Sequence, residues 1–493
     1  MSSEPIRLPY AASHVAVIDA VRALAFVGDL SMGQPVDHSL RTAWIASRLA
    51  AALGRGAEQQ RHCHDVALLR WSGCTANAPE VSELMGDDVL GRREMLATSG
   101  RSLPASMIAA IGKAGGLSDI HCEVSGDVAH RLGLAPVVER ALRHIFERCD
   151  GPATDIPIEV FLVAAAGDLE IFSRIYGIER ALALIKAKAD TQYPAALVDV
   201  LQQHAADWLH SLEQGEAGTD LAAVSISTSP SAPLELIADV IDLKLPWLTG
   251  FSRKVAGMAR GCAAALGGAE EQQQRLYRAG LIHGLGRASV PNHIWDAASP
   301  PGEGAAELLR LVPYWTARAV RRIGSLSAEA EIASFVDERL DGSGFFRGAS
   351  GAAISTECQV LAVAAHWVLL QTSRPGRPAL DPAQATARMQ AEVAQGRFAA
   401  DIVAALTGQA TTSLVPPTRV LPAAEALALS SREVEVLSRI SHGESNKEAA
   451  RALGISPSTV RAHLENVFRK LGCSTRAAAT LKAMHLGLFT RSA

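Results

Sequence analysis

The sequence predicts an all-α fold in which two copies of one helical domain precede a smaller four-helix module. Ala and Leu dominate the composition while aromatic residues make up only 5%, which favours helices packed on helices. An internal repeat covers most of the first four hundred residues. The last sixty or so residues carry helix-capping signals at successive helix starts.

Length and composition limit the classes of protein to consider. A chain of 493 residues indicates about three domains, and a hydrophobic content of 48% is ample for packed cores. No basic N-terminal region precedes a long apolar run, and no stretch of about eighteen apolar residues occurs. The seven cysteines are scattered without C-x-x-C spacing, as expected of reduced thiols. We therefore predict a soluble, cytoplasmic protein with no membrane partner.

The repeat relates the first half of the chain to the second. Two pairs of segments align, the first at an offset of 213 residues and the second at 191: His38–Gly54 with Phe251–Gly267, and Glu147–Gly151 with Glu338–Gly342. The change in offset predicts about 22 additional residues in the first copy, between positions 74 and 121.

Segments rich in Gly, Ser, Thr and Pro mark the joints between domains. They predict a first helical domain at 1–213, a linker at 214–234, a second helical domain at 235–406, a tether at 407–428 and a C-terminal module at 429–493. Residues 1–37 are expected to form mainly an amphipathic helix that leads into the first copy.

The C-terminal module starts its helices with capping chemistry. Ser430 and Ser445 are each followed three residues later by Glu, so hydroxyl and carboxylate can satisfy free helix amides reciprocally. Ser456 precedes a proline at the first helical position, where a missing N–H costs nothing. Gly454 and Gly472 stand where left-handed helix ends are expected.

The helix predicted over Ser458–Leu471 has two faces. Apolar side chains recur at helical spacing on the face expected to be buried: Val460, Leu464, Val467, Phe468 and Leu471. The opposite face has a spacing that suits a major groove and carries Ser458, Arg461, Ala462, Glu465 and Arg469. A short turn separates this helix from Ser445–Leu453, which predicts a helix-turn-helix.

The run LSSREVEVLSRISHGESNKEAARALGISPSTVRAHLENVFRKLGCSTRAAA closely resembles LuxR/FixJ-type helix-turn-helix domains. The resemblance implies that Ser458–Lys470 is the recognition helix, that a last helix at about 476–486 dimerises, and that the partner is double-stranded DNA bound by a homodimer. The module has a net charge of +5 although the whole chain has −4, which is typical of a domain that contacts phosphates. The predicted DNA-contacting residues are Asn446, Lys447, Ser456, Ser458, Thr459, Arg461, Ala462, Glu465, Arg469, Lys470 and Arg476.

The repeated domain is similar to HD-GYP domains of the HD superfamily. The second copy carries the blocks DLKLPWLTGFSRKVAGMA, LYRAGLIHGLGRASVPNHIWD, DERLDGSGFFRG and VLAVAAHWVLL, and the first copy carries GQPVDHSLR, HIFERCDGPA and IPIEVFLVAAAGDLEIF. The resemblance implies an all-helical phosphohydrolase whose active members cleave cyclic di-GMP with two metal ions. Their ligands are a first His, an HD dipeptide, a lone His, a His pair and a late Asp.

Most of those ligand places hold other residue types in this chain. In the second copy they read Phe251, His283-Gly284, Val312, Val336-Asp337 and Ala365. In the first copy His38 and His121 remain, but the other places read Arg70-Trp71, Ile145-Phe146 and Gly167. We therefore predict a DNA-binding transcriptional regulator with a catalytically degenerate HD-GYP-like region that senses a ligand or dimerises. The chain is predicted not to be an enzyme and to hold no metal and no cofactor.

The vacated places are predicted either to form a cavity for a small-molecule effector or to be filled core. The candidate residues are His38, His121, Phe251, His283, Val312, Asp337 and Ala365. His38 with His121 is the strongest metal suspect, while the literal His64-Asp65 dipeptide is interpreted as a surface pair and the turn Arg374–Pro378 as a loop that faces an anion.

Two alternatives stay open. One is a residual metal-dependent cyclic-dinucleotide phosphodiesterase fused to a DNA-binding domain. The other is a purely architectural region that only positions two DNA modules.

Overall fold

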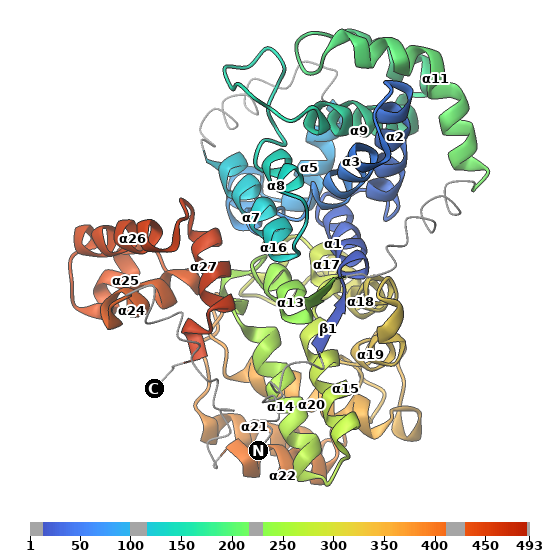
Figure 1. The fold of residues 1–493 in the computed structure, drawn as a ribbon. Coiled ribbons are helices and arrows are strands. Elements are labelled where there is room, and N and C mark those ends of the chain that lie inside the picture. The colour runs from blue at the N-terminus through green and yellow to red at the C-terminus, as the bar shows by residue number, and fades with distance from the viewer. Residues whose placement is uncertain (1–12, 99–115, 216–229, 411–428, 491–493) are drawn as a thin grey trace, which may run out of the picture.

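The computed structural model describes residues 13–98, 116–215, 230–410 and 429–490, and these residues are almost entirely helical (Figure 1). The only sheet in the described ranges pairs β1 (His14–Ala16) with β2 (Ser231–Pro233) in antiparallel register. The predicted all-α class is confirmed. The linker was predicted to extend to residue 234, but its last residues form β2, because β1 offers them a backbone partner.

The first copy forms the upper part of the molecule in Figure 1. Its helices are α1 (Val17–Ser31), α2 (His38–Ala52), α3 (Ala57–Leu69), α4 (Ala78–Met85), α5 (Asp88–Thr98), α7 (Leu117–Arg131), α8 (Pro136–Arg143), α9 (Ile158–Tyr176), α10 (Ile178–Lys186) and α11 (Ala195–Glu213). Helices α4 and α5 lie between positions 74 and 121, the interval in which the change in repeat offset predicted about 22 additional residues.

The second copy forms the lower part. Its α-helices are α13 (Leu234–Asp242), α14 (Phe251–Ala265), α15 (Glu270–Ile282), α16 (Asn292–Trp295), α17 (Glu303–Arg310), α18 (Val312–Val320), α19 (Ser327–Ala333), α20 (Thr356–Leu370), α21 (Pro382–Ala394) and α22 (Ala400–Ala410). Short 3₁₀ turns are η2 (Pro246–Leu248), η3 (Leu285–Ser289), η4 (Gly324–Leu326) and η5 (Gly351–Ala353).

The two copies repeat the same internal contact at the same sequence offset. In the first copy the Asp29 carboxylate accepts hydrogen bonds from the backbone N–H and hydroxyl of Ser39, at 3.1 and 2.6 Å. In the second copy Asp242 accepts the same pair of bonds from Ser252, at 2.9 and 2.7 Å. Each aspartate thereby satisfies a free amide in the first turn of the following helix.

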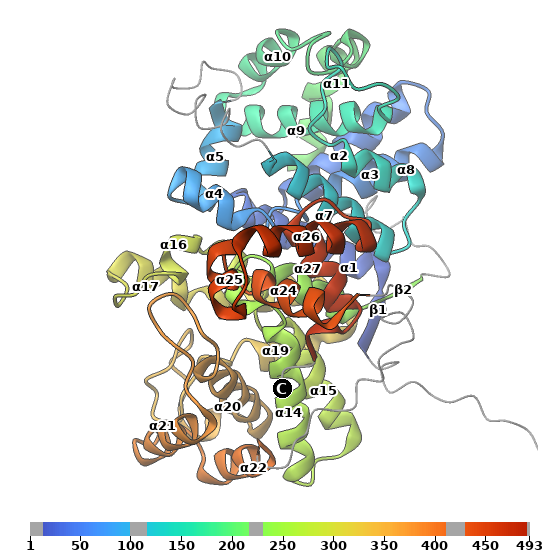
Figure 2. The ribbon, with the colours of Figure 1, turned by 90° about the vertical axis from the view of Figure 1, so that its left-hand side faces the viewer.

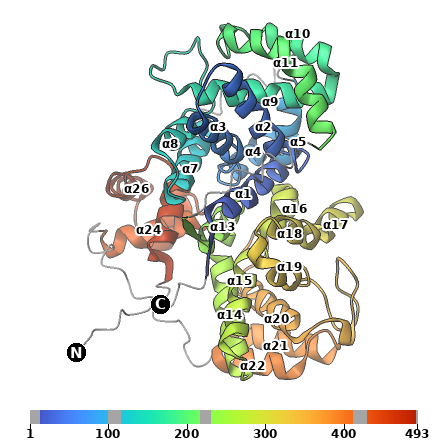
Figure 3. The ribbon, with the colours of Figure 1, turned by 45° about the vertical axis from the view of Figure 1, so that its right-hand side comes forward.

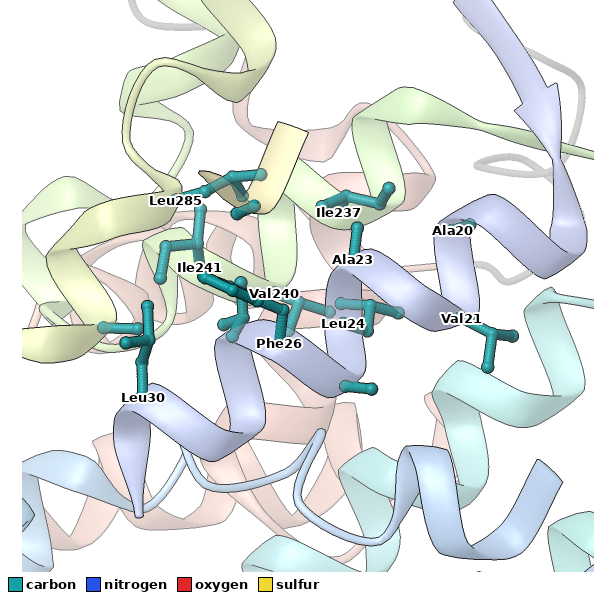
Figure 4. Close-up of a cluster of buried hydrophobic side chains, with 14 of the residues drawn as sticks. Ala20, Val21, Ala23, Leu24, Phe26, Leu30, Ile237, Val240, Ile241 and Leu285 are labelled. Atoms are coloured by element: carbon teal, nitrogen blue, oxygen red, sulfur yellow. The ribbon is translucent and has the colours of Figure 1, made fainter. Parts of the chain in front are cut away.

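Helix α1 joins the two copies. Figure 3 shows it between the upper and lower parts, and Figure 4 shows Leu24, Phe26 and Leu30 packed beside Ile241 of α13 and Leu285 of η3. We predicted an amphipathic helix here, and that is wrong, because α1 is buried on nearly all sides. A helix that packs against two domains has no face left for solvent.

The C-terminal module consists of α24 (Ser431–Ser441), α25 (Asn446–Leu453), α26 (Pro457–Leu471), α27 (Arg476–His485) and η6 (Leu488–Thr490). Both predicted capping boxes form, at Ser430 and Ser445, and Ser456 caps α26. Gly454 and Gly472 adopt φ of 64° and 60°, as left-handed helix ends require. The predicted helix-turn-helix is confirmed.

The module rests on both copies. Figure 2 shows it over their junction, and helix α27 contacts α7 of the first copy and α13 of the second. Its apolar side chains Ala478, Leu481 and Met484 belong to the same buried cluster as the cores of the two copies. Within the described ranges no helix is both long enough and apolar enough to cross a membrane.

Candidate functional site

The ligand places of the first copy line a cavity of about 710 Å³. Four of those places supply its wall: Arg70-Trp71, His121, Ile145-Phe146 and Gly167. Helices α4 and α5 close another side with Met85, Met95 and Leu96 among others. The cavity is lined mainly by apolar side chains, with Arg70, Arg92, Lys188 and Asp168 as its charged members. Such a lining suits a ligand with flat apolar surfaces and a few polar groups.

An arginine side chain fills the centre of the first copy's ligand places. The Arg70 guanidinium donates to Nε2 of His38 and, at 3.3 Å, to the hydroxyl of Thr42. Gly167, at the place of the late Asp, makes room for it, since a Cβ atom there would lie 2.0 Å from Nη1 of Arg70. The positively charged guanidinium of Arg70 therefore lies among the residues that stand at the metal-ligand places of the family.

The charges around Arg70 define the protonation of His38. Because Nε2 of His38 accepts from Arg70, its proton must lie on Nδ1, which donates to the buried Glu170 carboxylate. Burial, together with Arg70 and against the attraction of Glu170, lowers the pKa of His38. Burial alone would raise the pKa of Glu170, but His38 and Arg174 hold it at about 2. The imidazole is thus neutral and the carboxylate ionised near neutral pH.

His121, the other histidine retained in the first copy, is also engaged. Its Nε2 lies 2.7 Å from the carbonyl oxygen of Arg70, and its Nδ1 lies 3.6 Å from Sγ of Cys74. Burial lowers its pKa to about 4. The interpretation of His64-Asp65 as a surface pair is wrong for His64, which is only 5% exposed because it lies on the inner side of α3.

The ligand places of the second copy line a smaller cavity of about 220 Å³. Every predicted candidate of that copy contributes to its wall: Phe251, His283, Val312, Asp337 and Ala365. The sequence left open whether this place is a cavity or filled core, and the structure shows a cavity.

A guanidinium also enters the second copy's ligand places, but from a different position. Arg287 donates to Nε2 of His283 at 2.9 Å and lies over the Phe251 ring, 5.0 Å from its centroid. Gly284, at the Asp of the HD dipeptide, leaves the space, since a Cβ atom there would lie 2.3 Å from Nη1 of Arg287. In both copies an arginine guanidinium therefore lies at the former metal-ligand places, but the arginine comes from a different position of the repeat in each copy.

The residues present in the two copies do not fit a pair of metal ions. Both ring nitrogens of His38, His121 and His283 already have partners, and Gly, Phe and Val side chains have no donor atom. A guanidinium also repels a metal cation. In the described part of the chain no group of three or more His, Cys, Asp or Glu side chains could hold a metal ion.

The fit of Arg70 against Gly167 can be tested by adding one methyl group. Gly167→Ala is expected to destabilise the fold by about 1–3 kcal/mol, because the new Cβ would overlap a buried guanidinium. The midpoint of chemical denaturation measures this effect. Gly257→Ala in α14 is the matched control, since a Cβ there would meet no atom within 4 Å and should be neutral or stabilising. Equal behaviour of the two variants would contradict the described packing.

The predicted DNA-contacting residues form an exposed surface on α25, α26 and the start of α27. On α26 and its cap the exposed side chains are Ser456, Ser458, Thr459, Arg461, Ala462, Glu465 and Arg469, and Lys447 and Arg476 are exposed beside them. Arg461 is paired with Glu465 at 3.0 Å. Two residues have mainly internal partners: Lys470 binds the Glu433 carboxylate at 2.7 Å, and Asn446 accepts from Arg476 at 2.8 Å.

Helix α7 lies between the first-copy cavity and the DNA module. Leu117, Ser118 and His121 at its start line the cavity. One turn further on, the Glu123 carboxylate accepts from the backbone N–H and the hydroxyl of Ser474, at 2.7 and 3.0 Å. Farther along, Asp127 pairs with Lys482 of α27 at 3.4 Å. One rigid helix therefore contacts both a cavity and the module.

Two features of the cavities were not predicted: the entry of Arg287 into the second copy's ligand places, and the side chains of α4 and α5 in the wall of the first-copy cavity. Arg287 lies four residues beyond the HD place, so a comparison of ligand places alone does not reach it. Met85 of α4 and Met95 of α5 lie between the aligned blocks of the repeat, so no ligand place points to them. Arg70 itself stands at the HD place, so the sequence had already located this cation.

Comparison with known proteins identifies both parts of this helical molecule. Residues 235–402 match the HD domain model, and residues 427–483 match the model of bacterial regulatory proteins of the luxR family. The C-terminal module is therefore a luxR-family DNA-binding domain attached to an HD-type helical region.

The relatives divide in the same way. The chain is 25% identical to 3'3'-cGAMP-specific phosphodiesterase 3 of Vibrio cholerae, over 73% of this chain and 88% of that protein. A crystal structure of a cyclic GMP-AMP specific phosphodiesterase of V. cholerae shares the fold, with a TM-score of 0.58 and 20% identity over 82% of this chain and 99% of that one. The module region is 39% identical to the probable transcriptional regulatory protein NarL of Mycobacterium tuberculosis, over 19% of this chain and 40% of that protein.

These relatives correct one prediction. We predicted from the lost ligand places that the chain is not an enzyme, and the HD domain match together with the similarity to a phosphodiesterase over most of its length contradicts this. Residue types at the ligand places of one family do not by themselves define the chemistry of a relative.

Proposed function

We propose that this chain is a cytoplasmic transcription regulator that binds DNA as a dimer and is controlled by a cyclic dinucleotide in the first-copy cavity. The observation that carries the proposal is the position of α7, which lines the cavity at one end and binds the DNA module farther along. A ligand can control a distant site only by favouring one arrangement of an element that both sites contact.

The chemistry of the first-copy cavity supports this class of ligand. A cyclic dinucleotide presents flat bases and two anionic phosphates. The cavity offers the rings of Trp71 and Phe146, whose centroids are 6.4 Å apart, together with the cations Arg70 and Lys188. Nε1 of Trp71 is buried without a hydrogen-bond partner in the described residues. The V. cholerae relatives are named for 3'3'-cGAMP, which is therefore the first ligand to test.

The HD-type region buries part of the DNA module, and this burial indicates whether the ligand would strengthen or weaken DNA binding. Helix α27, which the LuxR resemblance implies is the dimerising helix, is buried against α7 and α13. Acidic Glu123 and Asp127 lie beside the module, where they would repel DNA phosphates. The arrangement described here is therefore the state with weaker DNA binding, and the nucleotide is proposed to release the module.

The direct test is the affinity of the full chain for a duplex selected from genomic fragments, measured by fluorescence anisotropy. Saturating 3'3'-cGAMP is expected to raise the affinity by about tenfold or more, as is typical of allosteric coupling. An unchanged affinity, together with no heat of nucleotide binding, would contradict the proposal.

A second candidate function is cyclic-dinucleotide phosphodiesterase activity, which is favoured by the HD domain match and by the named activity of the relatives. The same mixtures, sampled over time and supplied with divalent metal, should be assayed for linear products. Product formation at a rate proportional to protein concentration would support this activity. Intact nucleotide after prolonged incubation would contradict it.

Glu123 allows the contact between α7 and the module to be tested without ligand. Glu123→Gln is expected to raise DNA affinity about threefold to tenfold, because it removes an acceptor of Ser474 and a charge beside the module. Asp119→Asn is the control, since it removes the same charge from an exposed position of the same helix. Identical DNA affinities for the two variants would argue against control through this contact.

A further inference from the structure

The second-copy cavity contains more hydrogen-bond donors than the protein itself satisfies. Nη1 of Arg287 and Nε1 of Trp295 are buried, and neither has a hydrogen-bond partner in the described residues. Both residues line the 220 Å³ cavity. Buried N–H groups are normally paired, so two unpaired donors in one small cavity indicate a missing acceptor.

The cavity also has an excess of positive charge. Arg287, Arg339 and Arg374 line it, and Asp337 is the one acidic residue in its wall. Arg339 uses its Nη1 on the carbonyl oxygens of Glu338 and Val336, at 2.8 and 3.4 Å. Arg287 reaches Asp242 only at 3.8 Å. Three arginines therefore face a single carboxylate in the wall of the cavity.

Arg374 supplies the remaining free cation. It lies in the turn Arg374–Pro378, where its backbone pairs with Arg377 through two hydrogen bonds of 3.0 and 2.9 Å. Its guanidinium makes no hydrogen bond or ion pair with any residue of the described ranges. The turn thus holds the backbone of Arg374 in place while its side chain is left for another partner. The interpretation of this turn as a loop that faces an anion remains a prediction.

The geometry points to a phosphoryl group as the missing acceptor: we propose that the second-copy cavity binds inorganic phosphate or a small phosphate monoester between Arg287 and Arg374, with Trp295 as a third donor. The planar fork of arginine matches phosphate oxygens, and charge-assisted hydrogen bonds of this kind are the strong ones. This site is separate from the nucleotide cavity of the first copy, and it requires no metal.

Two variants test the site without disturbing the fold. Arg374→Ala removes a side chain without a hydrogen-bond or ion-pair partner in the described ranges, and Trp295→Phe keeps an aromatic side chain but deletes the unpaired N–H. Both variants should therefore melt at the temperature of the parent in phosphate-free buffer. Arg377→Ala is the matched control, because Arg377 is an exposed cation of the same turn that does not line the cavity.

The measurement is isothermal titration of the full chain with inorganic phosphate and, separately, with 5'-AMP. We expect Arg374→Ala to weaken binding about tenfold or more and Trp295→Phe about threefold to tenfold, with Arg377→Ala unchanged. Binding of phosphate alone assigns the site to the free ion, and binding of 5'-AMP alone assigns it to an ester; both support the proposal. Failure of both ligands, or binding that does not weaken in Arg374→Ala, would overturn it.

Discussion

Replacing Arg461 and Arg469 together with alanine is expected to lower the affinity of the chain for DNA by roughly 100-fold or more. Both side chains are exposed on α26, where Arg461 donates to Glu465 and Arg469 to Asn466 of the same helix. Each arginine contact to a base or phosphate is worth about 1–3 kcal/mol, so the loss of two gives this factor. The salt dependence of binding should also become shallower, by about one unit of slope for each lost phosphate contact.

A control for the Arg461 and Arg469 double variant must remove two positive charges from a surface outside the DNA module. Arg148→Ala with Arg310→Ala removes two exposed arginines of the HD-type region that also have only local acidic partners, Asp150 and Glu307. Their loss is expected to leave DNA affinity nearly unchanged. DNA binding by the α26 double variant at the strength of the parent would show that α26 is not the recognition helix.

The second large effect is expected at the joint between the two copies. Lys244 and Asp88 are 1% and 0% exposed, and Nζ of Lys244 lies 2.6 Å from the Asp88 carboxylate. The other carboxylate oxygen accepts from the backbone N–H of Asn292 at 2.7 Å. Asp88→Ala leaves an ammonium group buried without its partner, which typically costs about 3–5 kcal/mol.

The pH dependence of this variant follows from Lys244. Burial lowers its pKa, although Asp88 opposes that shift in the parent. Without Asp88 the pKa falls further, so between the folded and unfolded pKa values of Lys244 the unfolded chain binds a proton that the folded chain has lost. Stability of Asp88→Ala should therefore rise with pH from about 6 to 9, relative to the parent.

Chemical denaturation at the two pH values measures both effects. The double variant Asp88→Leu with Lys244→Met should recover most of the lost stability, because an apolar pair of similar volume removes the unpaired charge. If Asp88→Ala is as stable as the parent, the ion pair between Asp88 and Lys244 does not hold the two copies together.

The parts of the fold that local chemistry decides were predictable from sequence. Capping at Ser430 and Ser445 and the left-handed ends at Gly454 and Gly472 depend on a few neighbouring residues, and all of them form as expected. The burial of α1 was not predictable, because it depends on a second domain more than two hundred residues away.

The candidate site likewise has features that the sequence predicted and features that it could not predict. Alignment of the two copies located the ligand places, and they do line two cavities. Alignment placed Arg70 at the HD dipeptide of the first copy, but residue types could not reveal that Arg287, four positions beyond His283 in the second copy, also enters the ligand places. The contact between Glu123 and Ser474 joins residues 351 apart in the chain, so no local pattern records it.

The central claim, that the first-copy cavity and the DNA module are coupled through α7, is tested most directly by reciprocity. If the cyclic dinucleotide raises DNA affinity by a given factor, saturating DNA must raise the affinity for the nucleotide by the same factor. Calorimetric titration of the full chain with nucleotide, with and without the selected duplex, measures that factor. Nucleotide binding is expected to be about tenfold tighter in the presence of DNA, and equal nucleotide affinities in the two titrations would contradict coupling through α7.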